Sequence, residues 1–236
     1  MSGYLQGMNL IWNSTSSITV NPGIALDTTG NFNIYINSPV TITPSNIDTG
    51  SIAATSIYAV YALGKDNGAT TSSVVFSLGT LTPAVPSGFE TYRRIGWLFT
   101  DGSSNFIQFT QSGSQNEKTY AWASPYTFLT AGSATSYTTL GISNPGTLNT
   151  VPIDRICAVN VKATYTPALT NNQYSVVAFT PTSGFFPTGL GDFQNVPDVN
   201  YFTTYDSFSS SDPQVSYAVQ SGDSLTLQLI GFQDLL

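Results

Sequence analysis

Short runs of alternating apolar and polar residues, separated by turn residues, recur along the whole chain. In the clearest run, residues 153–166, alternate positions from Cys157 to Tyr165 are apolar and those between them are mostly polar. A side-chain period of two is that of a β-strand with one buried face. No segment shows the 3.6-residue apolar period of a helix over a useful length. The sequence therefore predicts an all-β fold of short strands.

Turn residues mark where these strands end. Asn21-Pro22-Gly23 is strong turn chemistry, because proline fixes φ and glycine accepts a positive φ. Asp101-Gly102 lies between the apolar runs 92–99 and 105–110, and Asp-Gly between two such runs predicts a hairpin. Turns at this spacing are typical of β-sandwiches and jelly rolls.

Two further strand pairs are predicted from sequence proximity. Residues 56–63 and 72–78 form the two most apolar runs of the first half, and we expect them to make its central hairpin. In the second half, residues 174–180 follow the run 153–166 after a short loop. We expect those two runs to pair in the same way.

A polar run, residues 112–117, contains only Ser, Gly, Gln, Asn and Glu and predicts a boundary between two units. We place an N-terminal β module at residues 1–112 and a C-terminal domain at 113–236. Both are predicted to be antiparallel β-sandwich or jelly-roll-like units without significant helix. The segment 83–99, with its two prolines, then lies inside the first unit as a turn followed by a central strand.

The chain has few charges, and this excludes several classes of partner. Charged residues make up 8% of the sequence, against roughly 25% in an ordinary soluble domain. The net charge is −7 with six basic residues, so a surface that follows nucleic-acid phosphates is not expected. No apolar stretch approaches the roughly 18 residues of a membrane-spanning helix, so we expect no membrane insertion.

Histidine is absent from the sequence, which removes the commonest general base and the usual transition-metal ligand. No glycine-rich phosphate loop is present. We therefore expect no catalytic activity, no cofactor and no bound metal. Paired carboxylates could still cleave a glycosidic bond, and loop oxygens could bind calcium, but ordinary solvated loop acids are the favoured interpretation. The acids concerned are Asp192, Asp198, Asp206 and Asp212.

Residues 182–213 form a long, poorly periodic segment that is rich in aromatics, Gly and Pro, and we interpret it as a loop. Its aromatics stand among Asn, Ser and Asp, so they could stack on sugar rings beside groups that bond sugar hydroxyls. The favoured alternative is that they pack under the loop or against a neighbouring copy of the chain. The residues are Phe185, Phe186, Phe193, Tyr201, Phe202, Tyr205 and Phe208.

Arg93 and Arg94 are the only adjacent pair of basic residues in the chain. Along a strand one should point outward and the other inward. The inner guanidinium needs a carboxylate partner, because an unpaired buried charge is costly. We expect Glu90 or Asp101 to supply it, which makes the arginines structural. Cys157, the single cysteine, is expected to be a small buried apolar residue.

Residues 10–112 resemble a module found in the virion proteins of tailed bacteriophages, especially fibres and adhesins. The residues that carry the resemblance are Trp12 with SITVNPG, Asp48-Thr49-Gly50, SIYAVYALG and VPSGFETYRRIGWLFTDGSSNFIQF. The family pattern is Tyr-x-x-x-Arg-Arg-Ile-Gly followed by an Asp-Gly hairpin, and Phe89 here replaces the tyrosine. The second half, from YAWASPYTFL to LIGFQDLL, is similar to the C-terminal β-domain that often follows this module.

The resemblance implies a non-enzymatic structural protein of the virion, commonly a homotrimeric fibre, spike or decoration on the tail or head. Its partners would be itself, other virion proteins and, as a further role, host-surface polysaccharide. Weakly charged faces suit such an assembly, because they pack with little charge desolvation and cover sheet edges. The N-terminus carries no recognisable secretion signal, which fits assembly in the host cell and release by lysis.

Two alternative functions remain open at this stage. The chain could be a carbohydrate-binding adhesin that uses the aromatic segment 182–213 as its sugar site. It could also be a polysaccharide-degrading enzyme that uses the loop carboxylates, although the missing histidine and the short chain disfavour this.

Overall fold

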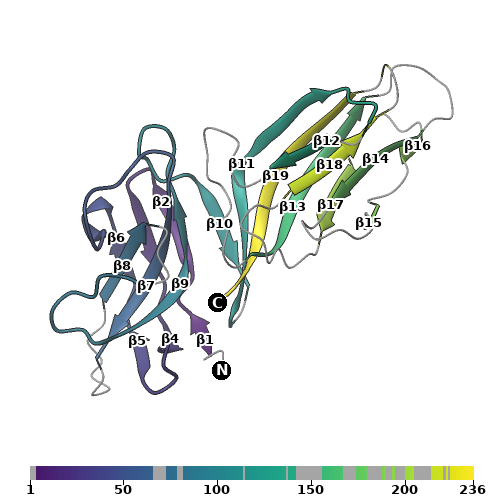
Figure 1. The fold of residues 1–236 in the computed structure, drawn as a ribbon. Helices are drawn as coiled ribbons and strands as arrows, with labels where there is room; N and C mark the ends of the chain where they lie inside the picture. The colour runs from purple at the N-terminus through teal and green to yellow at the C-terminus, as the bar shows by residue number, and fades with distance from the viewer. Residues whose placement is uncertain are drawn as a thin grey trace. The chain divides into compact units, whose positions relative to one another are not determined.

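The computed structural model shows a chain built of antiparallel β-sheets, as the strand period predicts (Figure 1). In the part of the chain that the structure describes, the one helical element is a single 3-10 turn, Pro44–Asn46. The described residues are 4–65, 73–78, 82–113, 115–136, 138–141, 156–166, 174–179, 188–189, 193–194, 200–204, 214–219, 222 and 224–236.

The chain divides into two compact units, and their boundary differs from the predicted one. Within the described residues, the first unit contains 4–123 together with Asp234–Leu236, and the second contains 124–141 and the parts of Ile153–Gln233. The polar run near residue 112 is therefore a turn inside the first unit. The last three residues, which the sequence assigned to the second domain, belong to the first because they pack there.

The first unit contains three groups of hydrogen-bonded strands. The first is β1–β4–β5, with bounds Leu5–Gly7, Gly23–Leu26 and Asn33–Ile36. The second is β8–β7–β9, with bounds Ser73–Leu78, Ile57–Gly64 and Thr91–Phe99. The third is β11–β10–β2–β3–β6, with bounds Glu117–Gly132, Phe109–Ser112, Leu10–Ser14, Ser17–Val20 and Val40–Ile42. Of β11, the residues up to Ala123 belong to this unit.

The sheet β8–β7–β9 forms the core of the first unit. Consecutive residues from Tyr58 to Gly64 are all buried, and since consecutive side chains point to opposite faces, both faces of β7 are covered. Two glycines show how closely neighbouring strands approach. A Cβ atom added at Gly64 would lie 2.8 Å from Ile34 of β5, and one added at Gly96 would lie 2.8 Å from Leu10 of β2.

Strand pairing in this unit matches one predicted hairpin and corrects another. The central hairpin is confirmed: β7 and β8 pair from Tyr58↔Leu78 to Leu63↔Ser73. The Asp101-Gly102 turn does return the chain antiparallel, but only over a short stretch: Thr100 and Phe106 form a bridge, and the Ile107 N–H donates to the Phe99 carbonyl. β9 pairs with β7, while β10 pairs with β11 and β2. Buried apolar contacts with distant strands therefore outweigh the local turn preference.

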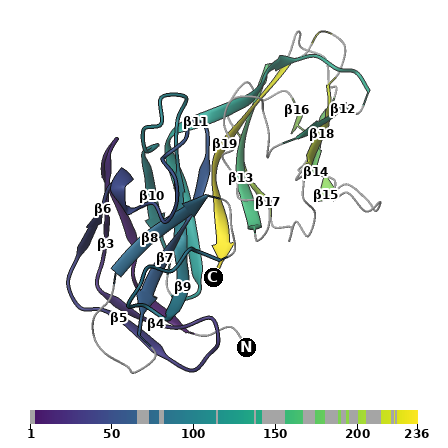
Figure 2. The same ribbon diagram turned by 60° about the vertical axis from the view of Figure 1, so that its left-hand side comes forward.

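The second unit contains two sheets, which Figure 2 shows as separate layers. One sheet has the order β17–β13–β19–β11, and its new strands are Asn200–Thr204, Ile156–Thr166 and Ser224–Leu235. The other has the order β12–β18–β14–β15, with bounds Thr138–Gly141, Gln214–Ala218, Tyr174–Phe179 and Thr188–Gly189. Leu225, Leu227 and Leu229 are buried at alternate positions of β19 and form part of the core.

Two predictions for this unit are wrong. β14 pairs with β18, β15 and β16 (Phe193–Gln194), whereas β13 pairs with β17, so the expected β13–β14 hairpin does not form. The segment 182–213 is also not a simple loop, because β15, β16 and β17 all lie within it. Its strands are two to five residues long, too short to show a side-chain period in the sequence.

Candidate functional site

The structure places three of the seven candidate aromatic residues. Phe193 belongs to β16, where it is the register partner of Ser175. Tyr201 and Phe202 belong to β17, opposite Lys162 and Val161 of β13. The backbones of these three residues are therefore fixed by strand pairing and do not lie in a free loop. Phe185, Phe186, Tyr205 and Phe208 lie outside the described residues, and so do Asp192, Asp198, Asp206 and Asp212. Cys157 lies in β13.

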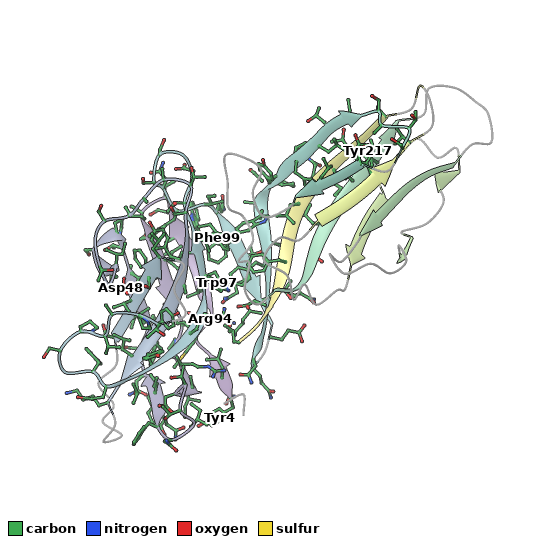
Figure 3. All side chains as sticks on the ribbon, in the orientation of Figure 1. Tyr4, Asp48, Arg94, Trp97, Phe99 and Tyr217 are labelled. Atoms are coloured by element: carbon green, nitrogen blue, oxygen red, sulfur yellow. The ribbon has the colours of Figure 1, made fainter. Side chains whose placement is uncertain are left out.

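Arg94 forms a buried bidentate ion pair, and its partner is not a predicted one. Its two terminal nitrogens donate to the carboxylate of Asp234 at 2.6 and 3.2 Å. Arg94 and its neighbour Trp97 are labelled in Figure 3. Glu90 is exposed, and Asp101 instead accepts hydrogen bonds from Ser103 and Asn105 within its own turn. The structural role expected for the arginine is supported, but the carboxylate comes from the far end of the chain.

Arg93 and Arg94 are both buried, each 8% exposed, so the expectation that one points into solvent is wrong. Both arginines are buried because both faces of β9 are covered: every residue from Arg93 to Phe99 is buried. The strand also contains an irregularity. Val60 pairs with Gly96 and Tyr61 with Arg94, which leaves Ile95 as an extra residue on β9.

Trp97 completes the surroundings of the Asp234 carboxylate. Its indole Nε1 donates to Asp234 Oδ2 at 2.9 Å, and the Arg94 guanidinium lies 4.6 Å from the centroid of its ring. The carboxylate therefore accepts three charge-assisted or polar hydrogen bonds, and the cation is further stabilised by the aromatic face. Because it is paired and excluded from solvent, this carboxylate is not available as a general acid or base.

A second group of polar side chains, buried except for the half-buried Gln111, adjoins this one through Trp97. The Tyr120 hydroxyl accepts a hydrogen bond from the Trp97 backbone N–H at 2.9 Å and another from Gln111 Nε2 at 2.6 Å. Gln111 Oε1 in turn accepts the backbone N–H of Leu10 at 2.7 Å. Burial, and secondarily the negative charge of Asp234, raise the pKa of Tyr120, so its hydroxyl stays protonated. The group links β2, β9, β10 and β11.

These clusters hold strands together and do not present reactive groups. Neither combines a nucleophile with a base, and apart from the half-buried Gln111 their side chains are buried. Among the described residues, no group of three or more His, Cys, Asp or Glu side chains could hold a metal ion. No helix in the described part of the chain is long and apolar enough to cross a membrane.

Comparison with known proteins adds no identification. No protein-family model and no curated protein matches this chain.

Asp234, Trp97, Tyr120 and Gln111 were not predicted from the sequence as members of these two clusters. One signal was present for part of this set. Positions 118, 120 and 122 alternate with exposed or half-buried positions along β11, and Tyr120 and Trp122 mark that face as the buried one. No comparable signal existed for Asp234, because nothing in its neighbourhood indicates that it reaches a strand near residue 94.

Proposed function

We propose that this chain is a structural subunit of a tailed-bacteriophage virion that forms a homotrimeric fibre, spike or decoration on the tail or head. The all-β architecture of two units, the low charge content and the resemblance of residues 10–112 to phage fibre modules support this proposal. Its expected partners are copies of itself and other virion proteins, with contact to the host surface as a further role.

The observation that carries the proposal is the place of the resembling segment in the fold. The residues YRRIGWLF form β9, and Arg94, Gly96 and Trp97 lie in the buried centre of the first unit. A sequence pattern at this position describes a scaffold rather than a reactive site. This is what a module reused in structural proteins requires, since its shape, and not a chemistry, is its function.

Two measurements test the proposal. Mass spectrometry and electron microscopy of purified particles should detect the chain and locate it on the head or the tail, and its absence from particles would contradict the virion assignment. Sedimentation of the purified chain should give three times the mass of the 25.1 kDa monomer. A monomer at micromolar concentration would contradict the trimer while leaving the virion assignment to the first measurement.

The carbohydrate-binding adhesin stays an alternative prediction for the segment 182–213. Replacing Tyr201 and Tyr205 by alanine should reduce attachment to host cells if those side chains contact sugar. Unchanged attachment would assign this segment to packing or assembly. A release of reducing ends from host polysaccharide would instead indicate an enzyme.

A further inference from the structure

Lys118 is a fully buried lysine whose ammonium group contacts only neutral acceptors. Its side chain extends from β11, and its Nζ donates to the Gly7 carbonyl at 3.2 Å and to Asn9 Oδ1. The one ion pair among the described residues joins Arg94 to Asp234, so no described carboxylate pairs with this ammonium. An ammonium has three donors, and two of them are used here.

A hollow of about 430 Å³ is lined in part by the residues that accept hydrogen bonds from Lys118, although Lys118 itself does not line it. These residues are Gly7 and Asn9. The ammonium is therefore one hydrogen bond away from residues of the lining. The described residues of the lining are all uncharged: Tyr4, Leu5, Gln6, Gly7, Asn9, Gly113 and Gln115. Tyr4, labelled in Figure 3, stays 44% exposed.

The buried cation gives this hollow a preference for anions. Burial lowers the pKa of Lys118, because the charged form lacks an opposite charge and has lost its water. An anion in the hollow would restore the ammonium form and take up its unused donor. The Asn9 carboxamide oxygen already occupies the place of one such acceptor, so direct contact between an anion and the ammonium requires the Asn9 side chain to turn aside.

The other lining groups indicate which chemical class of anion fits this hollow. The amides of Gln6, Asn9 and Gln115 both donate and accept, which suits neighbouring hydroxyl groups. The exposed ring of Tyr4 offers an apolar face beside them. The volume is within the range of small-ligand sites, roughly 300–1,000 Å³. A carboxylate on a hydroxyl-rich ring, as in a uronic acid, matches all three features.

We propose that this hollow binds the carboxylate of an acidic sugar, with Lys118 as the counter-ion and Tyr4, Gln6 and Gln115 around the sugar ring. The site lies within the first unit and is separate from the aromatic segment 182–213. The proposal does not depend on the chain being a virion protein.

Ligand-observed NMR on the full chain tests it with glucuronate, glucose and N-acetylglutamate as probes. We expect saturable binding of glucuronate, with glucose at least tenfold weaker because it lacks the charge. Equal binding of glucose and glucuronate would overturn the role of the carboxylate. N-acetylglutamate that binds as tightly as glucuronate would overturn the assignment to sugars.

Two variants connect binding to the buried cation. Lys118→Met should weaken glucuronate binding at least tenfold, while Lys65→Met, which removes the same charge elsewhere in the first unit, should leave it unchanged. Asn9→Asp should also abolish binding, because the new carboxylate supplies the missing counter-charge from within and should raise the melting temperature. This variant keeps the test valid if Lys118→Met fails to fold. Wild-type affinity in Asn9→Asp would refute the site.

Discussion

Arg94 and Asp234 are 140 positions apart in the sequence and form a buried bidentate ion pair, at 2.6 and 3.2 Å, inside the first unit. Asp234 is 1% exposed and also accepts the indole N–H of Trp97. The end of β19 therefore contributes to the core of a unit whose other described residues all precede position 124. If residues 234–236 belonged only to the second unit, there would be no reason for the Asp234 carboxylate to be buried beside Arg94.

Removing the carboxylate should be strongly destabilising. Asp234→Ala leaves the Arg94 guanidinium buried without its partner, and we expect a loss of about 3–5 kcal/mol in the free energy of unfolding. Urea unfolding of the full chain measures it. Glu90→Gln is the matched control, because Glu90 is exposed and should change stability little. A double variant, Arg94→Met with Asp234→Leu, should recover most of the loss. An unchanged stability in Asp234→Ala would rule out the ion pair.

Gly96 should not tolerate a side chain. An added Cβ would lie 2.5 Å from the Tyr120 hydroxyl and 2.8 Å from Leu10 Cδ1, both in the buried core. We expect Gly96→Ala to cost about 1–3 kcal/mol, as overpacking of a filled core does. Thermal unfolding followed by near-ultraviolet circular dichroism would also report the disturbed aromatic packing. Gly102→Ala faces open space and serves as the control. Equal melting temperatures for the two variants would contradict the close approach.

Lys118 should make stability depend on pH in the alkaline range. Its folded-state pKa lies below the ordinary value of 10.5, so the unfolded chain binds the proton more tightly. Stability should therefore rise as the pH increases through the folded-state pKa toward 10.5. Lys118→Met should remove this rise with pH, although it also leaves the Gly7 carbonyl and Asn9 Oδ1 without their donor.

Chemical unfolding of both proteins across this pH window provides the measurement for Lys118. The wild type should gain stability relative to Lys118→Met as the pH approaches 10.5, because its unfolded chain then loses the proton that the folded chain has already lost. Lys65→Met should show no such trend. A constant difference between wild type and Lys118→Met at all pH values would mean that the pKa of Lys118 is the same in the folded and unfolded chains, which would contradict the prediction.

Asp27 should stabilise the folded chain through its charged form, and this contribution should depend on pH in the acid range. Burial alone would raise the pKa of this carboxylate, but hydrogen bonds from the Thr29 hydroxyl and from the backbone N–H groups of Phe32 and Asn31 outweigh it and lower the pKa below 3.8. Its stabilising contribution is therefore present above pH 3.8 and is lost as the pH falls through the folded-state pKa.

Asp27→Ala tests this contribution. We expect a loss of about 1–3 kcal/mol at neutral pH, because two backbone donors of the turn lose their acceptor. The difference from the wild type should narrow in strong acid. Glu117→Ala, at an exposed position, is the control. If the difference stays constant down to the lowest pH, the carboxylate charge does not stabilise the turn.

Local features of the fold could be predicted from the sequence, for reasons visible in particular residues. The central hairpin of β7 and β8 follows from two apolar runs close together in the chain, and its register needs no distant partner. The importance of the segment around Arg94 could also be predicted, because two adjacent cations in an apolar strand require a structural explanation. Its partner could not, since the nearby acids were equally plausible in sequence.

The sequence by itself determined the all-β class, the strand period and the shortage of charge, because these depend on neighbouring residues and on composition. Only the tertiary structure decided which strands pair beyond their neighbours, that Asp234 closes the core of the first unit, and that Lys118 is buried beside a hollow. The physical reason is that pairing between distant strands is chosen by the total apolar surface and polar groups that it buries. A turn such as Asp101-Gly102 contributes only a small local preference against that sum.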